Sequence, residues 1–466
     1  MTVLFQKQIP QIPIKTICLL VFLYAAMGWA QTFGPRQVID EQPGALRMVR
    51  AADLDGDSDM DLVIAATPAI AWYENLDGQG TFVRHIIDEG MGQSFSIDIG
   101  RMDNNGSTDV VVSYFDMDMV GWYSNMGGGS FASFAEIASG LNNASGVTIV
   151  PIDGDSDNDL VLGVSNGNGL YWVENIGNTG NFGSLLTIDA NIAQARTQAV
   201  GDLDGDGDLD IVTNSGELDA TVAWFENTDG EGVFGSRQVV DATNFYENTL
   251  ALVDLDGDEN LDVVSENNSQ VIWRANTNGN GNFGPINVIS DVPSNIQEVY
   301  YGDFDLDDDM DVVSVSADDN TVAWYENTDG LGNFGPQQVI DSDLKSPRTV
   351  FAADLDGDGD LDIVSAALEP GGGERQLVWY ENLTILGNQD IKEPIVYVYP
   401  NPVSEILHIQ SRDPLQQVTF YDVLGQSLMT VHKDFENIPV SNLPAGVYFV
   451  EVQTLKGVLV KRVVKE

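Results

Sequence analysis

Seven short segments of this chain carry acidic residues at alternating positions. The first runs Asp53-Leu54-Asp55-Gly56-Asp57-Ser58-Asp59-Met60-Asp61. Two unit charges about 4 Å apart repel by roughly 4 kcal/mol at an effective dielectric constant of about 20, so such a turn opens unless a cation neutralises it. Oxygen ligands at alternating positions suit calcium, which accepts about six to eight of them, better than magnesium with its stricter geometry. The pattern therefore predicts calcium loops.

Two other interpretations of these loops are weaker. A single solvated acidic turn is common, but repetition in register argues against that interpretation. An EF-hand needs flanking helices and a Glu at its twelfth position, where the first loop has Ile64. The flanking residues here are β-branched and apolar, so each loop is expected to connect two strands of a hairpin.

The loops belong to a repeat of about 50 residues. They begin at Asp53, Arg101, Pro151, Asp202, Asp254, Asp303 and Asp354. A tryptophan follows each loop, most often as in Trp324-Tyr325-Glu326-Asn327, and the set is Trp72, Trp122, Trp172, Trp224, Trp273, Trp324 and Trp379. A phenylalanine, often Phe-Gly, leads into a short apolar strand at Phe33, Phe82, Phe131, Phe182, Phe234, Phe283 and Phe334.

The order of these elements predicts a closed ring. The first Phe element precedes the first loop, and none follows Trp379. The strand from Phe33 to Ile39 can therefore complete the sheet that ends at Trp379, which leaves no free edge. Each repeat holds four β-branched runs; in the last they are 334–340, 348–353, 362–367 and 376–380. The expected fold is all-β: a seven-bladed β-propeller followed by a small C-terminal β-sandwich. The repeated tryptophans are expected to pack between blades, with sugar stacking as the alternative.

The Phe-Gly elements and Asp-x-Asp-x-Asp-x-x-x-Asp loops resemble the FG-GAP or VCBS-type repeats of integrin α-subunit propellers and bacterial surface proteins. The resemblance covers residues 33–383. It implies that side chains at loop positions one, three, five and nine hold calcium, with five or six ions per chain. The implied ligands are Asp53, Asp55, Asp57 and Asp61; Asp153, Asp155 and Asp159; Asp202, Asp204, Asp206 and Asp210; Asp254, Asp256, Asp258 and Asp262; Asp303, Asp305, Asp307 and Asp311; and Asp354, Asp356, Asp358 and Asp362.

Two loops depart from that pattern. The third has Pro151 at its first position, and the second has Arg101 there and keeps only Asp103, Asn105 and Asp109. The Arg101 guanidinium is expected to replace the ion in part, so the second loop is expected to be empty or weak. The Gly that the family has at position six survives as Gly106, Gly207 and Gly359; Ser58, Ser156, Glu259 and Asp308 stand in the other loops, which leaves their turn geometry open.

Both ends of the chain carry export signals. Residues 1–30 read as a signal peptide, with Lys7 and Lys15 before a short apolar run that ends near Ala30; a membrane anchor would need a longer run. The single cysteine, Cys18, lies in this segment, so the mature protein is expected to lack cysteine and disulfides. Residues 31–384 form the expected propeller and 385–394 a linker.

Residues 395–466 resemble a type IX secretion sorting domain. The motifs are Tyr399-Pro400-Asn401-Pro402, Tyr421-Asp422-Val423-Leu424-Gly425, Leu443-Pro444-Ala445-Gly446-Val447-Tyr448 and Lys461-Arg462-Val463-Val464-Lys465. The resemblance implies a secreted or cell-surface protein with no transmembrane segment in the mature chain. Its tail would engage the type IX secretion machinery and be cleaved near Leu383.

Charge narrows the possible functions. The chain has 20 basic and 72 acidic residues and a net charge of −52, which repels nucleic acid and anionic membranes. The propeller contains one histidine, His85, one lysine, Lys345, and no cysteine, so it offers little for nucleophilic catalysis. We expect a non-enzymatic binding or adhesion module for an extracellular protein or glycan. A carboxylate-based polysaccharide lyase or hydrolase and a purely structural surface protein remain the alternatives.

The loops on one face differ most between repeats. The metal loops and the Trp-x-Glu-Asn to Phe-Gly turns are expected to share one face. The opposite face carries unlike loops such as 115–119, 166–169, 242–248 and 368–375. Specificity is expected on this second face, because unlike loops on a repeated scaffold are where ligand recognition usually lies.

Overall fold

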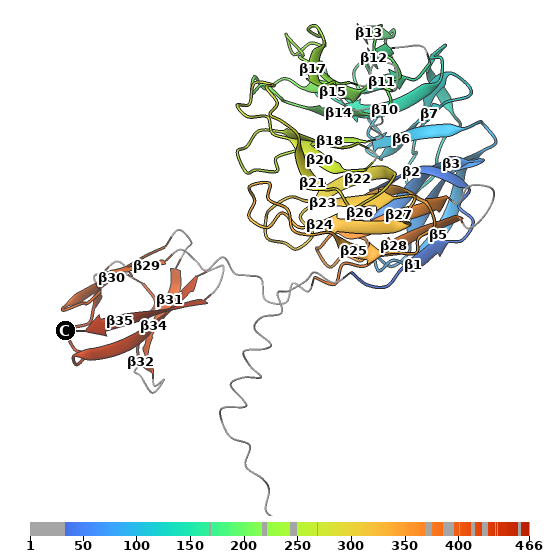
Figure 1. Ribbon diagram of the computed structural model, residues 1–466. Coiled ribbons are helices and arrows are strands. Elements are labelled where there is room, and N and C mark those ends of the chain that lie inside the picture. The colour runs from blue at the N-terminus through green and yellow to red at the C-terminus, as the bar shows by residue number, and fades with distance from the viewer. Residues whose placement is uncertain are drawn as a thin grey trace, which may run out of the picture. The chain divides into compact units, whose positions relative to one another are not determined.

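The computed structural model describes residues 33–166, 169–216, 221–242, 249–267, 269–368, 375–384, 396–399, 401–411, 415–421, 427–433, 435, 437–454 and 458–465. The expected signal peptide, 1–30, lies outside these ranges, as does the whole of the expected linker 385–394. The chain divides into two compact units, Met1–Thr384 and Ile385–Glu466, each described by itself (Figure 1).

The first unit contains seven four-stranded antiparallel sheets in its described residues. Five of them begin with β2 (Ala45–Ala52), β3 (Asp61–Thr67), β4 (Ala69–Asn75) and β5 (Phe82–Glu89); β6 (Ser94–Gly100), β7 (Asp109–Tyr114), β8 (Met119–Tyr123) and β9 (Ala135–Ser139); β10 (Ala144–Val150), β11 (Asp159–Val164), β12 (Gly169–Val173) and β13 (Leu186–Asp189); β14 (Gln198–Gly201), β15 (Asp210–Asn214), β16 (Val222–Phe225) and β17 (Gln238–Asp241); and β18 (Leu250–Val253), β19 (Asp262–Glu266), β20 (Val271–Arg274) and β21 (Asn287–Ser290). The other two contain β22 (Ile296–Gly302), β23 (Asp311–Ser316), β24 (Thr321–Tyr325) and β25 (Gln338–Asp341); and β26 (Pro347–Ala353), β27 (Asp362–Leu368), β28 (Arg375–Tyr380) and β1 (Gln37–Asp40).

The ring closes through a strand from the start of the described chain. Strand β1 pairs antiparallel with β28, with Gln37 opposite Trp379. The Gly34 N–H donates a 2.7 Å hydrogen bond to the Glu381 carbonyl, and Phe33 forms a bridge with Asn382. The first strands of the sheets contact one another in sequence, from β2 through β6, β10, β14, β18, β22 and β26 back to β2. The arrangement is the closed ring that the order of the repeats predicted.

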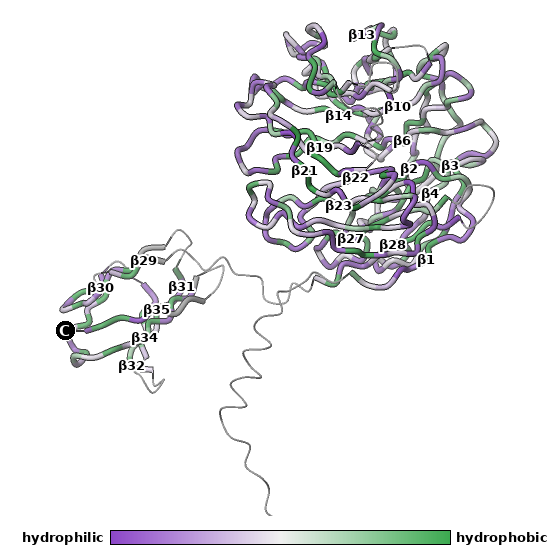
Figure 2. The backbone as a smooth tube through the Cα atoms, in the orientation of Figure 1, coloured by the Kyte–Doolittle hydropathy of each residue, from purple (hydrophilic) through white to green (hydrophobic). Residues whose placement is uncertain are grey.

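The hydrophobic core lies between neighbouring sheets. One cluster joins Leu46 and Val49 of β2 to Val364 and Ala366 of β27, on the two sides of the closure. The second strand of each sheet is apolar throughout because both of its faces are covered; Leu62–Ala66, in β3, are 0–1% exposed. Hydrophobic stretches therefore run within the sheets and hydrophilic ones in the loops around them (Figure 2).

The repeated tryptophans pack between sheets. Trp72 is 4% exposed, and a Cβ atom added to Gly129 of the next sheet would lie 2.3 Å from its indole ring. Only glycine fits so close to the ring. The same relation recurs for Trp122 with Gly180, Trp172 with Gly232, Trp224 with Gly281, Trp273 with Gly332 and Trp379 with Gly80. Trp324 contacts the Phe33 ring instead, at 6.4 Å between centroids. Burial confirms the packing role and leaves these faces closed to sugars.

A circuit of hydrogen bonds links each sheet to the one before it. Asp61, at loop position nine, accepts N–H groups from Leu54 at 2.9 Å and Asn75 at 2.8 Å. The Asn75 side-chain amide then donates, at 2.7 Å, to the carbonyl of Leu355 in the loop of the preceding sheet. The same three bonds recur at every junction, through the aspartates 61, 109, 159, 210, 262, 311 and 362 and the asparagines 75, 125, 175, 227, 276, 327 and 382.

The second unit is a small β domain of two sheets. One contains β29 (Val396–Tyr399), β30 (Ile406–Ser411) and β33 (Ile438–Pro439); the other contains β31 (Leu415–Tyr421), β32 (Ser427–Val431), β34 (Gly446–Thr454) and β35 (Val458–Lys465). Leu407, Phe420 and Val450 are buried in its core. The sequence of this unit predicts strands at 395–399, 406–410, 417–421, 446–453 and 458–464 but not β32 or β33. Strand β32 pairs with β31 at the edge of its sheet and is mostly exposed, and β33 is two residues long. The all-β class is confirmed for both units.

Replacing Asn227 by alanine tests the hydrogen-bond circuit. Asn227 is 0% exposed and its amide donates to the Ile152 carbonyl at 2.9 Å, so the variant leaves that buried carbonyl without its donor. Such a loss costs about 1–3 kcal/mol. We expect Asn227→Ala to lower the melting temperature clearly in a thermal melt. The control is Asn282→Ala, which removes only exposed hydrogen bonds. Equal melting temperatures for the two variants would contradict a structural role for the circuit.

Candidate metal centres

The aspartate at loop position one shapes the acidic turn in the five loops that have one. Asp53 accepts the N–H of Gly56 at 2.6 Å on one carboxylate oxygen and the N–H of Ser58 at 3.1 Å on the other. Asp202, Asp254 and Asp354 accept the equivalent pairs of backbone N–H groups, and Asp303 accepts those of the residues at positions five and six. The first carboxylate is thus fixed by the backbone before any ion binds.

Position six has the same backbone conformation in all seven loops. Its φ is 82° at Ser58, 68° at Glu259 and 72° at Asp308, against 96° at Gly207. The turn geometry, which the sequence left open, is therefore retained without glycine. A side chain in this left-handed region costs roughly 1–2 kcal/mol relative to glycine. The four loops with a non-glycine residue at position six therefore keep the same turn despite this conformational cost.

Five loops bring three carboxylates to within 4.8 Å of one another. In the first and fourth loops these belong to positions one, three and five; in the fifth, sixth and seventh they belong to positions one, three and nine. The groups are Asp53, Asp55 and Asp57; Asp202, Asp204 and Asp206; Asp254, Asp256 and Asp262; Asp303, Asp305 and Asp311; and Asp354, Asp356 and Asp362. Each group could hold a metal ion through hard oxygen donors.

The aspartate at position three carries the oxygen best placed for a cation. One carboxylate oxygen of this residue is buried and has no hydrogen-bond partner in four loops, at Asp204, Asp256, Asp305 and Asp356. A buried carboxylate oxygen without a donor is costly unless a cation or water satisfies it. Burial, followed by neighbouring carboxylates, raises the pKa of Asp305 to about 7. The donor set and the unsatisfied oxygen both fit a bound cation.

The aspartate at position nine has a second role that sequence analysis did not foresee. Its two backbone hydrogen bonds place it in the circuit between sheets, and Asp210, Asp262 and Asp311 are 0% exposed. Burial is the main cause that raises its pKa, to about 6 at Asp61 and about 8 at Asp311. The residue is first a structural acceptor, and in the fifth to seventh loops it also faces the cluster.

A glutamate outside the predicted ligand sets lies near position three. The pKa of Asp55 is raised by burial, then by Asp57, and also by the charge of Glu74. Glu226, Glu326 and Glu381 act in the same way on the fourth, sixth and seventh loops. The signal was present in the sequence, because these are the glutamates of the Trp-x-Glu-Asn segments. In the fifth loop the position is occupied by Ala275.

The second loop satisfies its own carboxylate. The Ser124 hydroxyl donates to one oxygen of Asp103 at 3.0 Å, and the Asn105 N–H donates to the other at 2.9 Å. The expected substitution of a guanidinium for the ion is wrong: Arg101 is exposed and forms no salt bridge with any carboxylate among the described residues. The Ser124 hydroxyl takes that place, since the position-five N–H donates to position three in the first and third loops as well.

The third loop is also outside the clusters. Asp153 accepts the N–H of Asp155 at 3.3 Å, while Asp159 is buried in the circuit. These three do not form a group of converging carboxylates in the part of the chain that the structure describes. Pro151 at position one removes the first carboxylate, which explains the difference from the fourth loop.

The propeller repeats match a known family. The FG-GAP-like repeat matches residues 53–112, 152–213, 202–265, 254–314 and 314–365. The chain belongs to the FG-GAP-like repeat family. The C-terminal unit matches the secretion system C-terminal sorting domain over residues 397–466, which indicates type IX secretion to the cell surface or the extracellular space. No curated protein matches the chain.

Two solved structures are similar in fold to the FG-GAP propeller. One is a lectin of Agrocybe aegerita, described by its specific recognition of non-reducing terminal N-acetylglucosamine; it is 19% identical, with a TM-score of 0.50, and the match covers 74% of this chain and 87% of the lectin. The other is BBS1N in complex with ARL6DN, 12% identical, with a TM-score of 0.51 and coverage of 75% and 97%. Among the residues that the structure describes, no helix has the length and apolarity needed to cross a membrane.

The raised pKa values predict how the metal-free propeller responds to pH. The carboxyls at position nine have pKa values of about 6 to 8 in the folded chain, above their ordinary value, mainly because of burial. The folded state therefore holds protons more tightly than the unfolded state, and stability falls as pH rises from about 4 to about 8. With chelator present, we expect a higher melting temperature at pH 5 than at pH 8. A melting temperature of the chelator-treated protein that rises from pH 5 to pH 8 would contradict the prediction.

Proposed function

We propose that this chain is a secreted, non-enzymatic binding module whose FG-GAP propeller is loaded with calcium and recognises a glycan or protein outside the cell. The observation that carries the metal assignment is the buried, unpartnered oxygen at position three, repeated in four loops. The five converging groups support five of the five or six ions expected per chain, and a sixth ion would have to bind in the third loop without a carboxylate at position one. Calcium is favoured over magnesium because its coordination is larger and more flexible.

The contacts of the propeller's histidine and lysine support a binding role over catalysis. His85 stacks on Trp72 at 4.7 Å between ring centroids and pairs with Glu74 at 2.7 Å. Lys345 is paired with Asp343 at the surface. Both side chains thus have structural partners. The fold similarity to a lectin supports a glycan as the first ligand class to test.

Removing calcium should destabilise the propeller strongly. An ion that binds only the folded state contributes about 2.7 kcal/mol at a hundredfold excess over its dissociation constant, so several ions together approach the ~5–15 kcal/mol stability of a typical domain. We expect a chelator to lower the melting temperature of the exported chain by tens of degrees. Sodium chloride should restore little, because screening is weak over a few ångströms.

Magnesium is the matched control for this measurement. Excess magnesium added with the chelator is expected to rescue poorly, and metal analysis after dialysis against trace calcium should return five or six calcium ions per chain. Overlapping melting curves with and without chelator, or two ions or fewer, would refute the calcium assignment.

A glycan and protein array tests the binding role. We expect the calcium-loaded chain to bind a restricted set of glycans and to lose that binding when a chelator unfolds the propeller. Heat-denatured chain is the control for nonspecific adhesion. Turnover of a polysaccharide by the same preparation would favour the lyase or hydrolase alternative. No binding to any glycan or protein would favour a purely structural role.

A further inference from the structure

A cavity of about 410 Å³ lies at the centre of the propeller. It is lined by residues of β2, β6, β10, β14, β22 and β26, which are first strands of six sheets and form the inner ring. Its lining is drawn from the beginnings of these strands, such as Arg47, Phe95 and Arg348, whereas the metal loops follow their ends. The cavity therefore opens toward the face opposite the metal loops. Its volume is in the range of small-ligand sites, about 300–1,000 Å³.

Arginines concentrate in this cavity. Residues 31–384 contain ten arginines and one lysine against 63 acidic residues, yet Arg47, Arg50, Arg196 and Arg348 all line the one cavity. The Arg47 guanidinium lies over the Phe95 ring at 5.4 Å, which fixes its position. Burial and the charge of Arg348 lower the pKa of Arg47, a sign that positive charges crowd together here.

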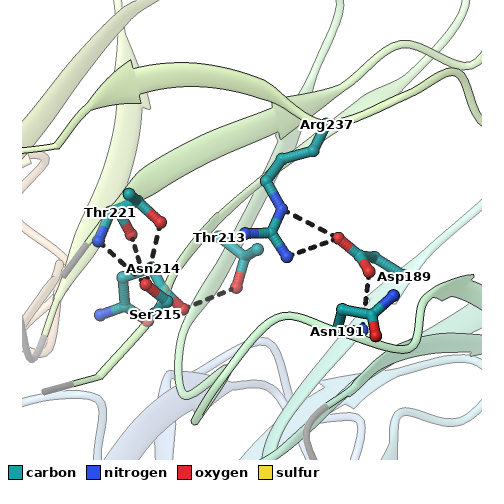
Figure 3. A network of polar contacts seen from close by, with 7 residues as sticks. All are labelled: Asp189, Asn191, Thr213, Asn214, Ser215, Thr221 and Arg237. Carbon is teal, nitrogen blue, oxygen red and sulfur yellow. Dashed lines mark hydrogen bonds and ion pairs between the residues drawn. The ribbon is translucent and has the colours of Figure 1, made fainter. Parts of the chain in front are cut away.

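Most of these arginines lack an acidic partner. Four arginines elsewhere in the propeller are paired with aspartates, among them Arg36 with Asp341 at 2.7 Å and Arg237 with Asp189 at 2.8 Å (Figure 3). Among the described residues no carboxylate forms a salt bridge with Arg47, Arg196 or Arg348, and Arg50 has only Asp98 at 3.8 Å.

The two acids nearest the arginines do not neutralise them. Glu298 lines the cavity, but one of its carboxylate oxygens accepts the Val350 N–H at 2.9 Å. Asp98 accepts the Ile149 N–H at 2.8 Å. Burial raises the pKa of both carboxyls and the charge of Arg50 lowers it, and four arginines face only these two acids. The cavity therefore keeps an excess of positive charge.

Several uncharged polar groups around the cavity are also unsatisfied. Both side-chain polar atoms of Gln198, the side-chain oxygen of Gln194, the Ser165 hydroxyl and the Nε of Arg348 are buried and have no hydrogen-bond partner. Buried polar groups are almost always paired in proteins, with protein, water or ligand. The Arg348 guanidinium donates to Gln297 through another nitrogen, but the unpartnered amide, hydroxyl and Nε atoms that remain in one cavity indicate a polar ligand.

We propose that this cavity binds the carboxylate-bearing terminal unit of an acidic glycan, a uronic acid. Guanidinium groups match a carboxylate with paired hydrogen bonds, and the free amides and hydroxyl suit the hydroxyls of a sugar ring. Phe95 and Phe115, stacked at 5.3 Å, add an apolar wall. The surrounding negative charge of the propeller repels a long polyanion, so a single charged end is favoured over an internal segment. This inference rests on the proposed glycan-binding function and names its ligand class.

Calorimetric titration of the calcium-loaded, exported chain tests the inference. Glucuronate is the probe, and glucose, which differs by the loss of the carboxylate, is its matched neutral partner. We expect glucose to bind at least tenfold more weakly than glucuronate. Arg348→Gln and Arg196→Gln should each weaken glucuronate binding about tenfold or more. Arg84→Gln is the control, because Arg84 is an exposed arginine paired with Asp40 outside the cavity, and it should leave the affinity unchanged.

Three results would overturn the inference. The first is equal affinity for glucose and glucuronate. The second is tighter binding of inorganic phosphate or of a short acidic peptide than of glucuronate. The third is an unchanged glucuronate affinity in both Arg348→Gln and Arg196→Gln. Melting temperature and calcium content, measured on each variant, establish that the propeller is intact. The titration and the glycan array can give different answers. If neutral glycans bind on the array but glucuronate gives no signal in the titration, the binding function is supported and the cavity is not a uronic acid site.

Discussion

The hydrogen bonds around the aspartate at loop position nine connect the acidic turns to the ring. That carboxylate accepts one N–H from its own loop and one from the asparagine that follows the tryptophan, and this asparagine reaches back to the preceding loop. Loop geometry and the contact between sheets are therefore set by the same buried group. An ion bound in a loop acts on the junction between two sheets as well as on its own turn.

Much of this architecture could be predicted because it is repeated. The strands, the closure by residues 33–39 and the buried tryptophans follow from elements that recur in register, and recurrence separates a structural position from chance. The role of position nine could not be predicted in the same way. In a loop sequence, an aspartate that binds metal cannot be told from one that accepts backbone N–H groups. Only the burial of the position-nine carboxylate, as at Asp210 and Asp311, reveals the structural role.

Features that only some of the repeats carry were missed by sequence analysis. Arg47, Arg196 and Arg348 each stand six residues before the first position of their loop, a position that holds arginine in only three of the seven repeats, and the ring brings their strands to one axis. The exposed position of Arg101 was equally hidden, because a charge next to an acidic loop suggests an ion pair that Ser124 makes unnecessary. Repetition reveals the scaffold, whereas the departures from repetition have to be located in space.

The pairing of β1 with β28 has a consequence for how the molecule is assembled. The last sheet contains strands more than 300 residues apart, so it cannot form until nearly the whole propeller has emerged from the export machinery. Joining such distant segments carries a large loop-closure entropy and slows the final step. Until that step is complete, the strands on either side of the seam have open edges that can pair with another chain. Pairing of β1 with β28 therefore competes with aggregation while the protein folds after export. A truncation at either end of the propeller removes a strand of the same sheet.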